Sequence, residues 1–161
     1  MAKELIKREE VPVEETWDLT PLFETEEAYE EAVASLKEEI NAFSEKWQGN
    51  IQTVEDVLQV MDRYEKALER LVPISTYASL SESVDGTNTK HQERSSKFYA
   101  FYAEFQSTLS FINSELLALE EEILQEAATR DERFTNYLND LIEWKPHQLH
   151  PEVEKALSAF S

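Results

Sequence analysis

The stretch that decides the fold covers residues 25–49 and reads TEEAYEEAVASLKEEINAFSEKWQG. Its apolar side chains recur at alternating spacings of four and three residues, which places them on one face of an α-helix. They are Tyr29, Val33, Leu36, Ile40, Phe43 and Trp47. Thr25 is a suitable N-cap, and Gly49 stands where a C-terminal stop is expected. The stretch therefore predicts an amphipathic helix.

Two further segments repeat this spacing. One follows Thr53 and covers residues 54–71, after which Pro73 should kink or break the helix before it resumes. The other covers residues 91–112 and is the most regular. Its stripe consists of His91, Ser95, Phe98, Tyr102, Phe105, Leu109 and Ile112, while Tyr99 and Phe101 lie off it. We expect the apolar faces of the three helices to pack against each other.

The last third of the chain has shorter segments. Residues 115–128 are acidic and rich in leucine, and residues 131–144 have apolar side chains on one side. Lys145-Pro146-His147 ends the second segment, and Pro151 suits the first position of a last helix. Its apolar face has only begun at Ser161. We therefore expect a chain cut from a larger protein, whose isolated end either frays or self-associates.

These segments predict an all-α fold, an antiparallel helical bundle with long heptad-spaced helices. Residues 1–24 form an irregular N-terminal arm and residues 25–161 the helical domain. The three-four spacing also fits a coiled coil, but turn signals separate the stripes at distances typical of a bundle. Two glycines and five prolines in 161 residues argue against a sandwich or barrel of short strands.

Composition excludes several classes of function. The formal charge is −19, from 34 acidic and 15 basic side chains, and it argues against nucleic acid and anionic membranes as partners. Without cysteine, neither disulfides nor thiolate zinc sites can form. The first ten residues lack the apolar core of a secretory signal, and no stretch approaches the length of a spanning helix. We expect a cytoplasmic protein.

The histidines are the first candidates for chemistry. His147 and His150 have a spacing seen in some metal sites, and Glu143 lies four residues before His147. Pro146 and Pro151 bracket the pair, so the three side chains cannot share one helical face. A structural zinc site also needs four ligands. We therefore predict a capping or loop-packing role for His147 and His150, and a position at a helix boundary for His91.

The remaining motifs also give no active site. Residues 85–88 (DGTN) predict a loop, but residues 85–89 lack the residue order of a calcium loop. Carboxylates at helical spacing are expected to form solvated faces. The chain has no G-x-x-x-x-G-K-[ST], no G-x-G-x-x-G, no G-x-S-x-G and no H-E-x-x-H. The residues alone assign no catalytic, cofactor-binding or metal-binding position.

Several short stretches, in order along nearly the whole chain, resemble oligoendopeptidase F, a zinc metallopeptidase of the thimet-oligopeptidase type. They are residues 8–12 (REEVP), 16–23 (TWDLTPLF), 68–71 (LERL), 77–80 (YASL), 111–119 (FINSELLAL), 145–149 (KPHQL) and 151–152 (PE). The last two are similar to the K-P-H-x-L-x-x-E-E-E region of the family, with a weaker acidic run.

The resemblance implies a cytosolic peptidase that cuts short peptides with zinc held by H-E-x-x-H and a further Glu. None of these positions exists in this sequence, so no family site residue is carried over. The chain looks like the N-terminal helical domain without the catalytic part, a wall of the peptide channel that limits access to unfolded oligopeptides. Its partners would be the catalytic domain and the peptide. The alternative is a stand-alone acidic helical bundle that acts as a protein-interaction module.

Overall fold

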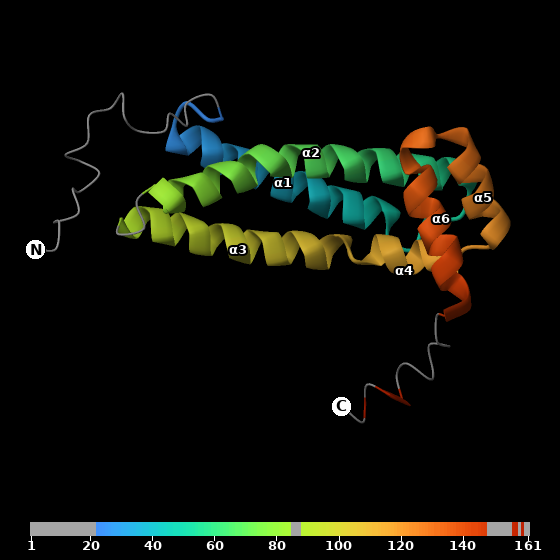
Figure 1. The fold of residues 1–161 in the computed structure, drawn as a ribbon. Helices are drawn as coiled ribbons and strands as arrows, with labels where there is room; N and C mark the ends of the chain where they lie inside the picture. The colour runs from blue at the N-terminus through green and yellow to red at the C-terminus, as the bar shows by residue number, and fades with distance from the viewer. Residues whose placement is uncertain (1–21, 85–87, 148–155, 158, 160–161) are drawn as a thin grey trace, which may run out of the picture. The chain divides into compact units, whose positions relative to one another are not determined.

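The computed structural model describes residues 22–84, 88–147, 156–157 and 159, and these residues are helical with no strand among them. The all-α prediction is confirmed. Within these ranges six α-helices follow one another (Figure 1). They are α1 (Glu26–Trp47), α2 (Val54–Val84), α3 (Thr89–Leu109), α4 (Phe111–Ala118), α5 (Glu121–Arg130) and α6 (Thr135–Trp144), with the short 3₁₀ helices η3 (Glu132–Phe134) and η4 (Lys145–His147).

The described residues group into two compact units. Unit 1 comprises residues up to 46 together with 64–110, and unit 2 comprises residues 47–63 together with those from 111 onward. Helix α2 contributes its first part to unit 2 and its remainder to unit 1. The expectation of one helical domain over residues 25–161 stays a prediction.

Unit 1 is a bundle of α1, the later part of α2, and α3 (Figure 1). Arg70 of α2 forms an ion pair with Glu39 of α1, whereas Tyr77 of α2 stacks on Tyr29 of α1, so these two helices are antiparallel. Helices α1 and α3 run parallel, because Glu26 pairs with Arg94 and Lys37 with Glu104. The core of unit 1 includes Leu36, Ile40, Ala67, Leu71, Ile74, Ala78, Phe98, Phe101 and Phe105.

The helix boundaries follow the local signals in the sequence. The hydroxyl of Thr25 accepts a hydrogen bond from the backbone N–H of Ala28 at 3.1 Å and caps α1. Gly49 has a φ of +79°, the left-handed conformation that ends a helix with least strain in glycine. At the start of α2, Asp56 Oδ2 accepts from the N–H of Thr53 at 3.0 Å and Thr53 Oγ1 accepts from the N–H of Asp56 at 3.2 Å.

Helix α2 is continuous through Pro73, so of the predicted kink or break the break is wrong and the kink stays a prediction. Leu71 and Ile74 are buried on either side of the proline. Their packing offsets the missing backbone hydrogen bond, because tertiary burial contributes more to helix stability than local preference does.

Helix α3 ends earlier than its apolar stripe predicts. Ser110 interrupts it, with its hydroxyl donating to the carbonyl of Ser107 at 2.8 Å, and Ile112 belongs to the separate helix α4. Within α3, Phe101 is buried and Tyr102 is partly exposed. Ser95, Phe98, Phe105, Leu109 and Ile112 of the predicted stripe are buried, so the core face follows that stripe, with Phe101 buried in addition and Tyr102 left at the surface.

Unit 2 packs α4, α5, α6 and the start of α2. Helices α5 and α6 lie against each other, and Arg130 and Arg133 form ion pairs with Glu55 and Asp62 of α2. The N–H of Gly49 donates to the carboxylate of Glu115. The core of unit 2 includes Val57, Val60, Ile112, Leu116, Leu124, Ala127, Phe134, Leu138 and Leu141.

Some predictions fall on residues that are not described. They are the irregular arm up to residue 21, residues 85–87 of the predicted loop, and most of the expected last helix after Pro151. For these segments the sequence-based expectations stay predictions.

Candidate functional site

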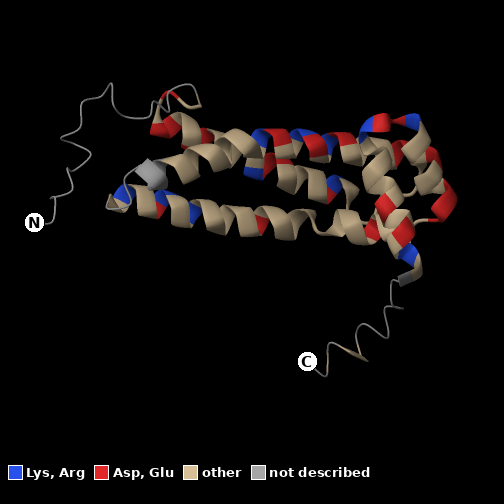
Figure 2. Cartoon of the chain, viewed as in Figure 1, with Lys and Arg blue, Asp and Glu red and all other residues tan. Residues whose placement is uncertain are grey.

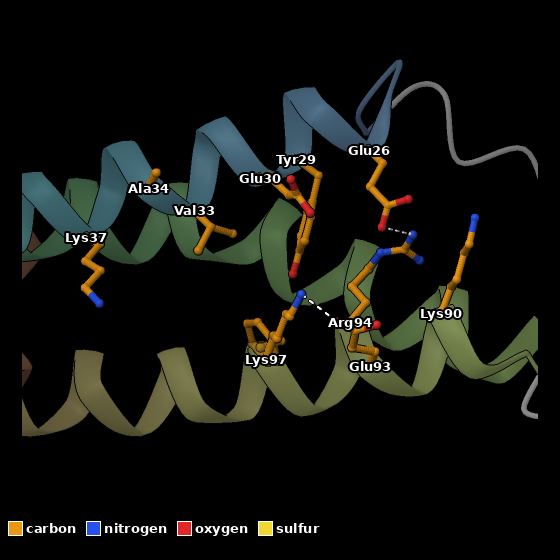
Figure 3. Close-up of a pocket in the computed structure, with 11 residues that line it drawn as sticks. Glu26, Tyr29, Glu30, Val33, Ala34, Lys37, Lys90, Glu93, Arg94 and Lys97 are labelled. Atoms are coloured by element: carbon orange, nitrogen blue, oxygen red, sulfur yellow. Dashed lines mark hydrogen bonds and ion pairs between the residues drawn. The ribbon is translucent and has the colours of Figure 1, made fainter.

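A groove lies between the first halves of α1 and α3 in unit 1 (Figure 3). Its volume is about 640 Å³. The lining side chains are Glu26, Tyr29, Glu30, Val33, Ala34 and Lys37 from α1 and Lys90, Glu93, Arg94, Lys97 and Phe98 from α3. We call it the α1–α3 groove. It combines apolar walls with charges of both signs.

Arg94 is the most enclosed charged side chain of this groove, with an exposed fraction of 8%. Its Nη2 donates to Glu26 Oε1 at 2.7 Å, and the guanidinium carbon lies 5.1 Å from the centre of the Tyr77 ring. Both contacts stabilise a buried cation. Arg94 Nε is buried and has no hydrogen-bond partner among the described residues. One donor of the guanidinium therefore stays unsatisfied.

An aromatic cluster supports the groove from inside the bundle. The rings of Tyr29 and Tyr77 stack with their centres 4.8 Å apart, and Phe23 meets both edge-on at 5.6 and 5.4 Å. Burial raises the pKa of the Tyr29 phenol, although the nearby Arg94 acts in the opposite direction. Tyr29 is therefore a neutral wall of the groove at pH 7 and no base.

The groove reverses the charge balance of the chain, because four of its lining side chains are basic and three are acidic. Figure 2 shows basic positions gathered in the first half of α3. Lys97 pairs with Glu93 at 2.8 Å, which lowers the pKa of Glu93 and raises that of Lys97. Lys37 pairs with Glu104 at 2.9 Å. Lys90 makes no ion pair within the described part of the chain.

The sequence reasoning missed this groove. A signal was present, because Lys90, Arg94 and Lys97 recur at helical spacing in a chain dominated by acidic residues. Their partners across the groove, Glu26 and Val33, come from a helix about 60 residues earlier. Spacing within one segment cannot reveal a site made by two parallel helices.

The predicted candidates lie elsewhere. His91 is in the first turn of α3, as expected, and its Nδ1 is buried without a hydrogen-bond partner in the described structure. Asn88, from the predicted loop, caps the same helix by accepting from the N–H of Lys90 at 3.0 Å. The side chains of His147 and His150 are outside the described residues. The described residues hold no group of three or more His, Cys, Asp or Glu that could bind a metal ion.

Lys145 brings together two of the stretches that carry the resemblance. Its ammonium group donates to the backbone carbonyls of Leu117, at 2.8 Å, and Leu119. These carbonyls lie at the C-terminal end of α4, where a positive charge is favourable. Lys145, the first residue of the KPHQL stretch, therefore contacts the end of the FINSELLAL stretch within unit 2.

The comparison with known proteins agrees with this resemblance. A family model described as Oligopeptidase F matches residues 115–161. Oligopeptidase PepF of Bacillus subtilis is 30% identical over 162 aligned residues, which cover 98% of this chain and 24% of that protein. The chain is similar to the N-terminal domain of oligoendopeptidase F. The predicted resemblance is thereby confirmed.

Two further relatives of this kind have similar coverage. The plasmid-encoded oligoendopeptidase F of Lactococcus lactis subsp. cremoris is 27% identical, over 94% of this chain and 26% of that protein. The group B oligopeptidase PepB of Streptococcus agalactiae is 30% identical, over 90% and 25%. The chain thus spans about a quarter of the length of the oligopeptidases that it matches. No solved structure is significantly similar to it.

Crossing a membrane requires a helix that is both long and apolar. None of the helices in the described ranges has both properties.

Proposed function

We propose that this chain serves as the N-terminal helical domain of a cytosolic zinc oligoendopeptidase. In that role it forms a wall of the enclosed peptide channel and limits access to short, unfolded peptides. The observation that carries the proposal is the similarity to oligopeptidases over 90–98% of the chain. Its partners are the catalytic region of the longer protein and the oligopeptide substrate.

The lack of a suitable set of zinc ligands in this sequence supports a domain that is inactive by itself. A zinc peptidase of this type uses two histidines one helical turn apart, with a glutamate that activates water. The sequence has no H-E-x-x-H, and the described residues do not fit a zinc ion. In this proposal the zinc and the nucleophilic water belong to the catalytic region.

Exposed apolar side chains of unit 1 support its packing against another surface. Exposed large apolar side chains of this unit lie on α2 and α3; they are Leu68, Val72, Tyr99 and Tyr102. Burial and the phenol of Tyr102 on α3 raise the pKa of Tyr64 on α2. Tyrosine is enriched in the core of protein–protein interfaces.

The same exposed side chains also favour the second candidate, a stand-alone acidic bundle that acts as a protein-interaction module. The two functions differ in the coding sequence expected downstream of Ser161, so sequencing that genomic region separates them. We expect the reading frame to continue into an H-E-x-x-H, whereas an immediate stop codon would favour the interaction module.

Access control has its own test in that longer protein. One cleavable sequence is placed in peptides of increasing length and in a loop of a stably folded protein. Cleavage of the short peptides and protection of the folded protein are expected. Equal cleavage of the folded loop would refute the channel-wall role, even if the catalytic motif were present.

A further inference from the structure

We propose that the α1–α3 groove binds the C-terminal carboxylate of an oligopeptide. Lys90 and Arg94 face the carboxylate, and the last apolar side chain of the peptide lies on Val33, Ala34 and Phe98. The inference deepens the proposed function and rests on it, since oligopeptides are its ligands. The groove of about 640 Å³ has a size typical of sites for small ligands.

The first support is the position of the cations. Helices α1, α2 and α5 each begin with two acidic residues, which suits the positive end of a helix. Helix α3 has no acid in its first turn and has Lys90 there, followed by Arg94 four residues later and Lys97 three after that. The three side chains project from α3 toward α1 (Figure 3). Three cations therefore lie together at one end of the groove, where Glu26 and Glu93 pair with two of them.

The second support is the unsatisfied hydrogen-bonding capacity there. Arg94 is more than nine-tenths buried, and its Nε lacks a hydrogen-bond partner among the described residues. A buried donor without a partner is unfavourable, and an incoming anion can offset that cost. Arg94 and Lys97 each already neutralise one glutamate, whereas Lys90 makes no ion pair within the described residues. Lys90 is thus the cation most available to a ligand.

The opposing charge comes from Glu30, which also lines the groove and makes no ion pair in the described part of the chain. Because its carboxylate repels an anionic ligand, its removal should strengthen binding. This opposite effect distinguishes a carboxylate site from a groove in which the side chains only maintain the fold.

The experiment titrates two probes into the ¹⁵N-labelled chain and follows amide chemical shifts. One probe is acetyl-Ala-Ala-Ala-Ala-Leu with a free carboxylate, and the other is the same peptide with a C-terminal amide. Acetylation removes the amino charge, so the probes differ only at the C-terminus. We expect saturable shifts in α1 and α3 with the free acid, and binding about tenfold weaker with the amide. Added salt should weaken binding of the acid.

Three variants test the residues. Lys90→Gln should weaken binding of the acid about three- to tenfold, and Glu30→Gln should strengthen it about twofold. The matched control is Arg63→Gln, which removes one exposed positive charge outside the groove and should leave affinity unchanged. Arg94→Gln should abolish binding. If that variant unfolds by circular dichroism, Lys90→Gln and Glu30→Gln still decide.

Several results would overturn the proposal. They are equal binding of acid and amide, equal effects of Lys90→Gln and Arg63→Gln, weaker binding in Glu30→Gln, or shifts confined to helices other than α1 and α3. Failure here would leave the proposed function intact, because that function is tested by the downstream sequence and by cleavage. Conversely, carboxylate binding can succeed in a chain that lacks a catalytic region.

Discussion

Phe105→Ala is the sharpest test of the bundle. Phe105 is 1% exposed in the last third of α3 and meets the ring of Phe101 edge-on, with the two ring centres 6.2 Å apart. Truncation removes a whole buried ring and leaves a cavity, which costs about 3–5 kcal/mol. A domain of this size has a free energy of unfolding of about 5–15 kcal/mol, so the loss should shift the urea midpoint strongly.

The assay is urea unfolding followed by far-ultraviolet circular dichroism, with Tyr99→Ala as the control. Tyr99 lies on the same helix and is 61% exposed, so its truncation should cost less than about 1 kcal/mol. Hydrogen exchange should show the loss of protection in α1 and α3 before α5 and α6, since Phe105 belongs to unit 1. A cost below about 1 kcal/mol for Phe105→Ala, or equal costs for both variants, would refute this packing of α3.

The remaining predictions concern the other helix ends and the metal. Asp56→Ala should lower the free energy of unfolding by about 0.5–2 kcal/mol, because it removes the reciprocal cap of α2. Burial acts to raise the pKa of Asp56, but hydrogen bonds from the backbone and from Thr53 outweigh it and lower the pKa. The stabilising contribution of Asp56 should therefore be present above about pH 4 and be lost as the pH falls through the folded-state pKa. In urea titrations at several acidic pH values, the free energy of unfolding of Asp56→Asn should therefore depend less on pH than that of the parent chain. Lys145→Met should cost about 1–2 kcal/mol in the same assay, since it keeps the apolar stem and removes the donor to two carbonyls at the end of α4. Elemental analysis should find far less than one zinc per chain, and an equimolar zinc that disappears in His147→Ala would contradict this.

The helix ends were predictable because their signals are local. Thr25, Gly49 and Thr53 act through hydrogen bonds and backbone angles within a few residues of their own positions. The continuity of α2 was not predictable from Pro73 alone, because the packing of Leu71 and Ile74 on other helices decides it.

The core face of α3 shows a different limit. The three-four pattern placed Phe98, Phe105 and Leu109 correctly in the core, but it also placed Tyr102 there, and Phe101 is buried instead. Phe101 and Tyr102 are adjacent aromatic residues, so two neighbouring faces of the helix have almost the same periodicity. The choice between them depends on where α1 and α2 lie, and that information is not local.

The α1–α3 groove was not predictable either, because it depends on which side chains other helices place against α3. Spacing alone would place three cations, Lys90, Arg94 and Lys97, on the solvated face of a surface helix. Lys90 and Lys97 are indeed exposed, whereas Arg94 is buried. Arg94 differs because α1 places Glu26 against it, and α2 places Tyr77 beneath it. Burying a guanidinium costs several kcal/mol unless its hydrogen bonds are satisfied, and here Nε is left without a partner in the described structure. A chain with 34 acidic side chains has many ways to complete that pairing. An incompletely paired arginine beside an unpaired lysine is therefore better explained by a ligand than by stability, since departures from local optimisation concentrate at functional sites.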